Sequence, residues 1–221
     1  MNSRLEAWST TLLTACAVVL TVLYGVDRVT TSHAEPRQSA RLEQVASTDF
    51  GAIDSVALGQ KQHSRSVLLT EFIDLECPFC AAFARRLDSA RALLGDSLEI
   101  RYANFPLSNH RFARSGAAAV ECAFKLGGGD AFVRTVYAQH DSLGFWTWER
   151  YAATAGITDS GAFASCRNSQ QIAVRVDLAL QLAGRLNLRG TPTVFVGASR
   201  YDRPPSLEVL LSDIRRLSRE P

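Results

Sequence analysis

The sequence lacks an excess of charge of either sign. Its 221 residues include 24 lysines and arginines against 22 aspartates and glutamates, which gives a formal net charge of +2. Proteins that bind a polyelectrolyte usually carry a strong basic surplus, so we expect no nucleic-acid partner. With 47% hydrophobic residues, the chain is long enough for one well-buried domain with appendages.

Charged residues are also missing from residues 7 to 26, "AWSTTLLTACAVVLTVLYGV". Twenty helical residues at about 1.5 Å each span the roughly 30 Å hydrocarbon core of a bilayer, so we expect one transmembrane helix here. The alternative is a cleaved signal peptide, because Ser32 and Ala34 in "TSHAEP" form a small-x-small pattern. The apolar stretch is longer than a usual signal core and ends well before that site, which favours an anchor.

A second C-x-x-C motif is absent, although one is present in "ECPFC", at Cys77 and Cys80. A structural zinc site needs four ligands, usually two such pairs or one pair with closely spaced histidines. The four histidines are scattered along the chain, at His33, His63, His110 and His140. We therefore expect neither a metal nor another cofactor. A redox-active pair is favoured over a permanently oxidised structural one.

The order of predicted elements is strand, helix, strand, a helical block, a strand pair and a last helix. Residues 29 to 48 are polar with few large apolar groups, which predicts a linker. Buried-strand patterns cover residues 67–74, 98–105 and 191–197, with a further strand at "SRY". Helical patterns cover residues 78–95, 110–126, 130–142, 147–156 and 169–187, and a last helix follows Ser206.

With C-P-x-C at the first strand-helix junction and Thr-Pro before the third strand, residues 50 to 220 resemble the DsbA-like thiol-disulfide oxidoreductases. The specific segments are "FIDLECPFC" and "RGTPTVFVG". The resemblance implies a thioredoxin-like α/β fold, a mixed sheet flanked by helices, with an inserted helical subdomain. The expected parts are an anchor or signal (1–28), the linker (29–48), a thioredoxin-like domain (49–106 and 188–221) and the insertion (107–187).

The resemblance also implies roles for the site residues. Cys77 is the nucleophile, Cys80 resolves the mixed disulfide, and Pro192 is cis and faces the cysteines. Thr191 pairs its backbone with the substrate peptide, and Pro78 and Phe79 border the same surface.

General chemistry supports the roles of the two cysteines. Only a thiolate attacks a disulfide, and the unpaired N–H groups at a helix N-terminus stabilise an anion at Cys77. Cys80 lies one helical turn later, so it can reach the sulfur of Cys77 and expel a bound partner. Pro78 presets the first turn and removes an N–H that would have no partner there.

Two charged strand residues suggest a proton path. Glu71 lies six residues before Cys77, where DsbA-like proteins carry a buried acid, and Arg101 matches the basic residue of the neighbouring strand. A buried carboxylate beside a cation can take the proton that Cys80 must lose. The alternative is a structural ion pair or two surface charges.

Other residues near the motif carry weaker expectations. Phe79 replaces the histidine of strongly oxidising relatives, and Asp74 and Glu76 oppose a nearby anion, so we expect a milder oxidant. His110 is a candidate at the border of the site, with a helix cap or surface position as the alternative. Three aromatic residues are candidates for a peptide groove, with core packing as the alternative: Phe145, Trp146 and Trp148.

The remaining cysteines predict a structural disulfide. Cys16 falls in the proposed membrane span, and removal of the active pair leaves Cys122 and Cys166, both in the helical block. A bond between them would close a loop of about 45 residues. The alternative is two small buried thiols.

The leading function is an oxidase or isomerase that exchanges disulfides with exported, cysteine-containing proteins. The domain would lie on the extracytoplasmic side of the cytoplasmic membrane, where disulfides persist, and a membrane or thioredoxin-like redox partner would recycle it. A reductase of the same fold is the alternative enzyme. A thioredoxin-like binding or holdase module is the alternative outside enzymes, but such a module needs neither the cysteine pair nor Thr191-Pro192.

Overall fold

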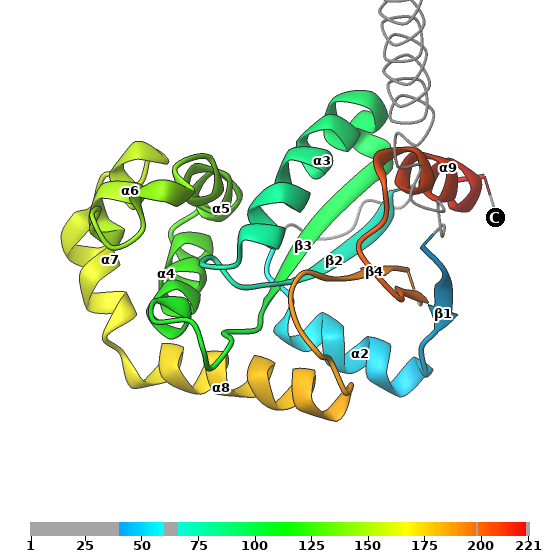
Figure 1. The fold of residues 1–221 in the computed structure, drawn as a ribbon. Helices are drawn as coiled ribbons and strands as arrows, with labels where there is room; N and C mark the ends of the chain where they lie inside the picture. Colours follow the sequence, from blue (N-terminus) through cyan, green and yellow to red (C-terminus); the bar gives the residue numbers. More distant parts are fainter. Residues whose placement is uncertain (1–39, 60–65, 198, 220–221) are drawn as a thin grey trace, which may run out of the picture. The chain divides into compact units, whose positions relative to one another are not determined.

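A computed structural model describes residues 40 to 219 apart from residues 60 to 65 and residue 198. Within these residues a mixed sheet has the strand order β1-β5-β4-β2-β3 (Figure 1). The strands are β1 (Leu42–Gln44), β2 (Val67–Ile73), β3 (Leu98–Asn104), β4 (Thr193–Val196) and β5 (Ser199–Tyr201). β2 and β3 are parallel, whereas β2 with β4, β4 with β5, and β5 with β1 are antiparallel.

Strand β2 lies between β4 and β3, and all seven of its residues are buried. Side chains alternate between the two faces of a strand, so its odd-numbered and even-numbered residues enter different cores. Val67 and Leu69 pack into one core with residues of helices α3 (Pro78–Leu94) and α9 (Leu207–Leu217). Phe72 packs into the other with residues of helices α2 (Ser47–Val56) and α8 (Gln170–Arg185). This division between faces decides which charged residues can reach the cysteine pair.

Four helices cover the sheet. They are α2 (Ser47–Val56), α3 (Pro78–Leu94), α8 (Gln170–Arg185) and α9 (Leu207–Leu217). Helix α3 begins at Pro78, directly after its N-cap residue Cys77. It ends before Gly95, whose φ of 51° places it in the left-handed region that glycine adopts without a steric penalty. The predicted helix boundaries around the cysteine motif are thus confirmed.

The helical block lies between β3 and β4 in the sequence, and its first four helices form a group beside the sheet (Figure 1). These helices are α4 (Ala113–Lys125), α5 (Gly129–Ala138), α6 (Trp148–Thr154) and α7 (Ser160–Arg167). Phe132, Tyr151 and Phe163 are completely buried among them. The sequence analysis did not predict α7.

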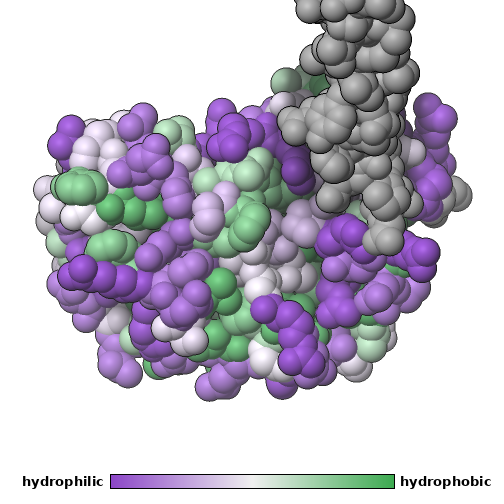
Figure 2. Space-filling view, in the orientation of Figure 1, coloured by the Kyte–Doolittle hydropathy of each residue, from purple (hydrophilic) through white to green (hydrophobic). Residues whose placement is uncertain are grey.

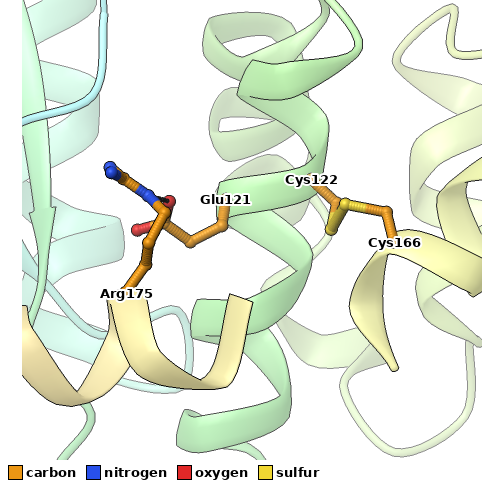
Figure 3. Close-up of a disulfide and its surroundings, with 4 residues drawn as sticks. All are labelled: Glu121, Cys122, Cys166 and Arg175. Atoms are coloured by element: carbon orange, nitrogen blue, oxygen red, sulfur yellow. Dashed lines mark hydrogen bonds and ion pairs between the residues drawn. A yellow bond between two sulfur atoms is a disulfide. The ribbon is translucent and has the colours of Figure 1, made fainter. Parts of the chain in front are cut away.

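Two adjacent residues of α4 tie this group to neighbouring helices (Figure 3). Cys122 forms a disulfide with Cys166 of α7, with an S–S length of 2.06 Å. Glu121 points to the other side, where its buried carboxylate receives a hydrogen bond of 2.6 Å from Arg175 of α8. Asn104 at the end of β3 donates to the second oxygen of Glu121 at 3.0 Å. The helical group is therefore joined covalently within itself and by polar contacts to the sheet.

The predicted linker needs correction. Strand β1 lies inside residues 29 to 48 and pairs with β5, so that Leu42 lies opposite Tyr201. Helix α2 begins at Ser47, within the same stretch. The prediction is therefore wrong for residues 42 to 48. Composition suggested a linker because β1 is only three residues long and polar, and its stability comes from the edge of an existing sheet.

The predicted transmembrane helix over residues 7 to 26 lies outside the described residues. Within the described part of the chain, no helix combines the length and the apolar character that a membrane crossing needs. On the face seen in Figure 2, hydrophobic residues occur in small groups separated by hydrophilic ones.

Candidate active site

Both cysteines of the motif are free thiols at the junction between β2 and α3. A turn precedes the helix, in which the backbone N–H of Cys77 donates to the carbonyl of Asp74 at 3.0 Å. The carbonyl of Cys77 then accepts the N–H of Ala81 at 3.2 Å, which starts the helix. Cys77 is 3% exposed and Cys80 is completely buried. Cys77 is therefore the cysteine nearer to solvent.

The surroundings of Cys77 favour its thiolate. A hydrogen bond from the Cys80 thiol, helped by the backbone N–H groups of Phe79 and Cys80, lowers the pKa of Cys77 to about 5. Burial acts in the opposite direction but is outweighed. At neutral pH, Cys77 is therefore almost entirely a thiolate, as the N-terminus of α3 leads one to expect. This stabilisation does not need a histidine at position 79.

The surroundings of Cys80 favour its thiol. Burial raises the pKa of Cys80 well above its ordinary value, and the negative charges of Cys77 and Glu71 act in the same direction. The two cysteines thus have pKa values shifted apart by their environments. Cys77 can attack without a base, whereas Cys80 needs one.

The loop before β4 lies against Cys77. The Thr191–Pro192 peptide bond is cis, and the Cys77 thiol lies 3.3 Å from the carbonyl oxygen of Thr191. The hydroxyl of Thr193 donates to the carbonyl of Gly190 at 2.7 Å and fixes the loop. Phe79, two residues after Cys77, is 72% exposed. The structure therefore places the Thr191–Pro192 loop against the reactive cysteine.

Glu71 lies on the α3 face of β2 and is completely buried. Neither of its carboxylate oxygens accepts a hydrogen bond from a described residue. Burial raises the pKa of Glu71 well above its ordinary value, while the positive charge of Arg91 lowers it. An acid in this environment keeps its proton to a higher pH than an ordinary carboxyl does.

The basic residue near Glu71 is Arg91 of α3, and the prediction of Arg101 is wrong. In the register of the parallel strands, Glu71 lies opposite Tyr102, so Arg101 points to the other face of the sheet. There it forms ion pairs with Asp54 of α2 and with Glu99. Arg91 instead donates to the hydroxyl of Tyr102 at 3.0 Å and pairs with Asp130.

Asp74 holds the turn before Cys77 in place. One of its carboxylate oxygens accepts the N–H of Glu76 at 2.9 Å. The other accepts the N–H of Leu107 at 2.9 Å and lies 2.8 Å from Nδ1 of His110. His110 is thus neither a helix cap nor a free surface residue; it borders the site through Asp74.

The helical group contacts the same turn from its own side. Tyr137 donates to the carbonyl of Asp74 at 3.3 Å, and Nε2 of His140 lies 3.1 Å from the carbonyl of Glu76. The side chain of Glu76 accepts the backbone N–H of Phe112 at the start of α4. Asp74 and Glu76 are therefore occupied by hydrogen bonds that position the turn.

The family model described as thioredoxin matches residues 52 to 215, well over half of the chain. The chain belongs to the thioredoxin family. Its fold is DsbA-like, because solved structures of DsbA-family proteins superimpose on it.

Three such structures illustrate the likeness of this thioredoxin-family chain to DsbA-like proteins. BdbD from Bacillus subtilis has a TM-score of 0.65 at 16% identity, over 83% of this chain and 100% of that one. A thioredoxin-like oxidoreductase from Silicibacter pomeroyi has a TM-score of 0.62 at 18% identity, over 75% of this chain and 92% of that one. Alpha-DsbA1 from Wolbachia pipientis has a TM-score of 0.60 at 20% identity, over 73% of this chain and 89% of that one. The predicted thioredoxin-like fold with its mixed sheet is confirmed.

Curated relatives of this thioredoxin-family chain include two proteins named Na(+)/H(+) antiporter NhaA 1. The one from Mycolicibacterium gilvum is 32% identical over 138 residues, which are 62% of this chain and 22% of that protein. The one from Mycolicibacterium vanbaalenii is 30% identical over 145 residues, which are 65% of this chain and 24% of that protein. The chain thus spans less than a quarter of the length of these relatives.

The three aromatic candidates separate into two groups. Trp146 lies against Tyr151 with ring centroids 5.2 Å apart, and Trp148 lies against Tyr151 at 5.7 Å. Both tryptophans therefore pack on the core of the helical group, which was the alternative expectation. Phe145 is 87% exposed, and no contact in the described residues places it at the cysteine pair.

Proposed function

We propose that this thioredoxin-family chain is a thiol-disulfide oxidoreductase that uses Cys77 and Cys80 as its redox pair. The observation that carries the proposal is the opposite shift of the two pKa values, down to about 5 for Cys77 and well up for Cys80. A structural pair or an incidental pair has no need for this asymmetry. The Thr191–Pro192 loop against Cys77 supports the same conclusion.

In the oxidising direction the reaction begins with the Cys77–Cys80 disulfide. A substrate thiolate attacks Sγ of Cys77, a new S–S bond forms, and the bond to Cys80 breaks with its electron pair left on Cys80. A second substrate thiolate then attacks the substrate sulfur of the mixed disulfide and releases Cys77 as a thiolate. The substrate dithiol has lost two electrons and the cysteine pair has gained them. The low pKa of Cys77 makes it a good leaving group.

Glu71 is proposed as the group that exchanges a proton with Cys80. When Cys80 leaves as a thiolate, its high pKa makes it take up a proton, which a protonated Glu71 supplies. In the reducing direction the same steps run backwards, and a Glu71 carboxylate takes the proton before Cys80 attacks. The unpaired oxygens of Glu71 support this role over a structural ion pair.

The surface around Cys77 is proposed as the binding site for the substrate peptide. Thr191 would pair its backbone with an extended segment beside the reactive cysteine, and Pro192 keeps a competing N–H out of that surface. Pro78 and the exposed ring of Phe79 would contact the segment from the other side. Extended peptides often bind through such main-chain pairing.

The substrates we propose are exported proteins with cysteines, outside the cytoplasmic membrane, where disulfides persist. Oxidation or isomerisation is favoured, and a membrane or thioredoxin-like redox partner would recycle the pair. Reduction of selected thiols by the same site is the alternative within enzymes. The relatives named as antiporters do not enter the proposal, because the match covers less than a quarter of their length.

A tether through residues 7 to 26 is part of this proposal. We expect the protein to stay in the membrane fraction after extraction with alkaline carbonate, because twenty uncharged residues are long enough to span a bilayer. Immunoblots of the carbonate pellet and supernatant measure this. A mature protein that begins at Glu35 would instead identify a signal peptide.

Turnover with a protein substrate tests the proposed activity. We expect the chain to speed disulfide formation in a reduced, unfolded test protein when a glutathione buffer supplies the oxidant. Replacement of Cys77 by serine should abolish the effect, because the Cys77–Cys80 disulfide that oxidises the substrate can no longer form. A Cys77→Ser variant as active as the parent would refute the assigned chemistry.

A further inference from the structure

A charged cavity lies directly beside the loop that contacts Cys77. Its volume is about 430 Å³, and Thr191 and Pro192 form part of its wall. The rest of the wall comes from the chain just before this loop, from Thr193 of β4, from β5 and the segment that follows it, and from Glu43 of β1. The cavity is thus continuous with the proposed peptide surface, yet the redox chemistry makes no use of it.

Positive charge exceeds negative charge in this cavity. Its wall contains three arginines and two carboxylates: Arg189, Arg200, Arg203, Glu43 and Asp202. Both carboxylates already have partners in the structure. Among the residues that the structure describes, Arg189 is left without an ion-pair partner.

The partners of the carboxylates are on neighbouring strands and loops. Glu43 pairs with Arg200 at 2.8 Å. Asp202 accepts the backbone N–H of Arg41 at 2.9 Å and lies 3.6 Å from Arg203. The hydrogen bond from Arg41 lowers the pKa of Asp202, so this carboxylate stays ionised and keeps its partners.

Arg189 is exposed and makes no ion pair with any residue between 40 and 219 that the structure describes. Two residues of chain span at most about 7 Å, so Arg189 lies within that distance of Thr191 along the backbone. Thr191 in turn contacts the Cys77 thiol at 3.3 Å. A substrate residue about two positions from the reactive cysteine can therefore reach the guanidinium of Arg189.

We propose that this cavity binds an acidic side chain of the substrate polypeptide, close to its reactive cysteine, and that Arg189 determines this preference. The proposal rests on the proposed function, because the cysteine must dock at Cys77 for the neighbouring acid to reach Arg189. A carboxylate suits the site because a guanidinium binds it in bidentate geometry. The chain thereby selects acidic segments among exported proteins.

The test uses two synthetic peptides with one cysteine each. One has aspartate two residues before and two residues after the cysteine, and the other has asparagine at both places. The rate of mixed-disulfide formation with the oxidised protein should be about twofold to fivefold higher for the aspartate peptide, as expected for one exposed ion pair. The preference should weaken as salt is added.

Matched variants assign the preference to one arginine. Arg189→Gln should remove it, and Arg189→Glu should reverse it toward a peptide with lysines. Arg185→Gln removes an exposed arginine at the end of α8 that does not line the cavity, so it should leave the preference unchanged. A preference that survives in Arg189→Gln would overturn the proposal.

Two further readouts separate this proposal from the proposed function. Dithiothreitol carries no carboxylate, so its reduction of the oxidised protein should be equally fast in all variants. If it fails in the parent chain, the proposed function is wrong. Peptides with serine in place of cysteine measure binding without redox chemistry. Equal affinities of the aspartate and asparagine versions, measured by calorimetry, would overturn the cavity proposal alone.

Discussion

Replacement of Cys80 by alanine should trap substrates on Cys77, with about tenfold or more covalent complex than the Cys77→Ala variant yields. The expectation follows from the pKa shifts, because Cys77 is a thiolate at neutral pH and Cys80 is a buried thiol. Without Cys80 the nucleophile still attacks but cannot release its partner. Non-reducing gels of the purified variants, with mass spectrometry of the adducts, measure the difference.

Three controls sharpen this test. Cys80→Ser keeps a hydroxyl that can donate a hydrogen bond to Cys77, so it should trap at least as well as Cys80→Ala. The double variant Cys77→Ala/Cys80→Ala should trap nothing, which also excludes Cys16 as the trapping group. Dithiothreitol should release every complex. Equal trapping by the two single variants would contradict the assignment of Cys77 as the nucleophile and Cys80 as the resolving cysteine.

Replacement of Glu71 by glutamine should slow the release of mixed disulfides by about tenfold or more, the low end for a lost general acid or base. In the reducing direction the parent rate should rise with pH, because Glu71 must be ionised to accept the proton of Cys80. Its pKa lies well above the ordinary value, so this rise is displaced upward from the usual carboxyl range. The rise should vanish in Glu71→Gln. Single-turnover rates between about pH 5 and 8 would measure both effects.

The same variant should change stability in a defined direction. A carboxyl whose pKa is raised by folding binds more protons in the folded state than in the unfolded one, so stability falls as pH rises through that interval. Glu71→Gln removes this loss and should be more stable than the parent at neutral pH. Glu121→Gln is the matched control, because Glu121 is equally buried but pairs with Arg175 (Figure 3). Glu121→Gln should lose stability, but the pH dependence of its single-turnover rate should match that of the parent. The same change of this pH dependence in both variants would argue against a specific role for Glu71.

The sequence predicted the parts of the site that depend on local structure. A buried strand followed by Cys-Pro places Cys77 at a helix N-terminus, and the structure has this arrangement from Val67 to Leu94. The Cys122–Cys166 disulfide is present as predicted, and its prediction needed only that these two cysteines remain once Cys16 and the active pair are set aside. Such inferences need only spacing and periodicity.

The sequence did not predict the contacts that depend on how distant strands align. The choice of Arg101 failed by one residue of register, since Glu71 lies opposite Tyr102 and a shift of one position changes the face of the sheet. Arg91 comes from a helix whose rotation about its axis no strand pattern reveals. Helix periodicity places Arg91 on the buried side of α3, because Leu87 lies four residues earlier and is buried.

The contacts around Asp74 were likewise hidden from the sequence. Its partners His110 and Leu107 belong to the segment after β3, and Tyr137 belongs to α5. An acid next to the motif suggested repulsion of a thiolate, whereas in the structure its charge is used to hold the turn. Only the folded chain brings these segments together.

Equilibration with glutathione buffers tests directly whether Cys77 and Cys80 form a cycling redox pair. The fractions of dithiol and disulfide at Cys77 and Cys80 are measured by alkylation and mass spectrometry across the range from reduced to oxidised buffer. We expect one reversible two-electron transition of this pair, while Cys122 and Cys166 stay bonded throughout. A midpoint potential near that of thioredoxin, about −270 mV, would favour the reductase alternative. A pair that remains dithiol in every buffer, or a disulfide that the reduced buffers cannot open, would contradict a cycling redox pair.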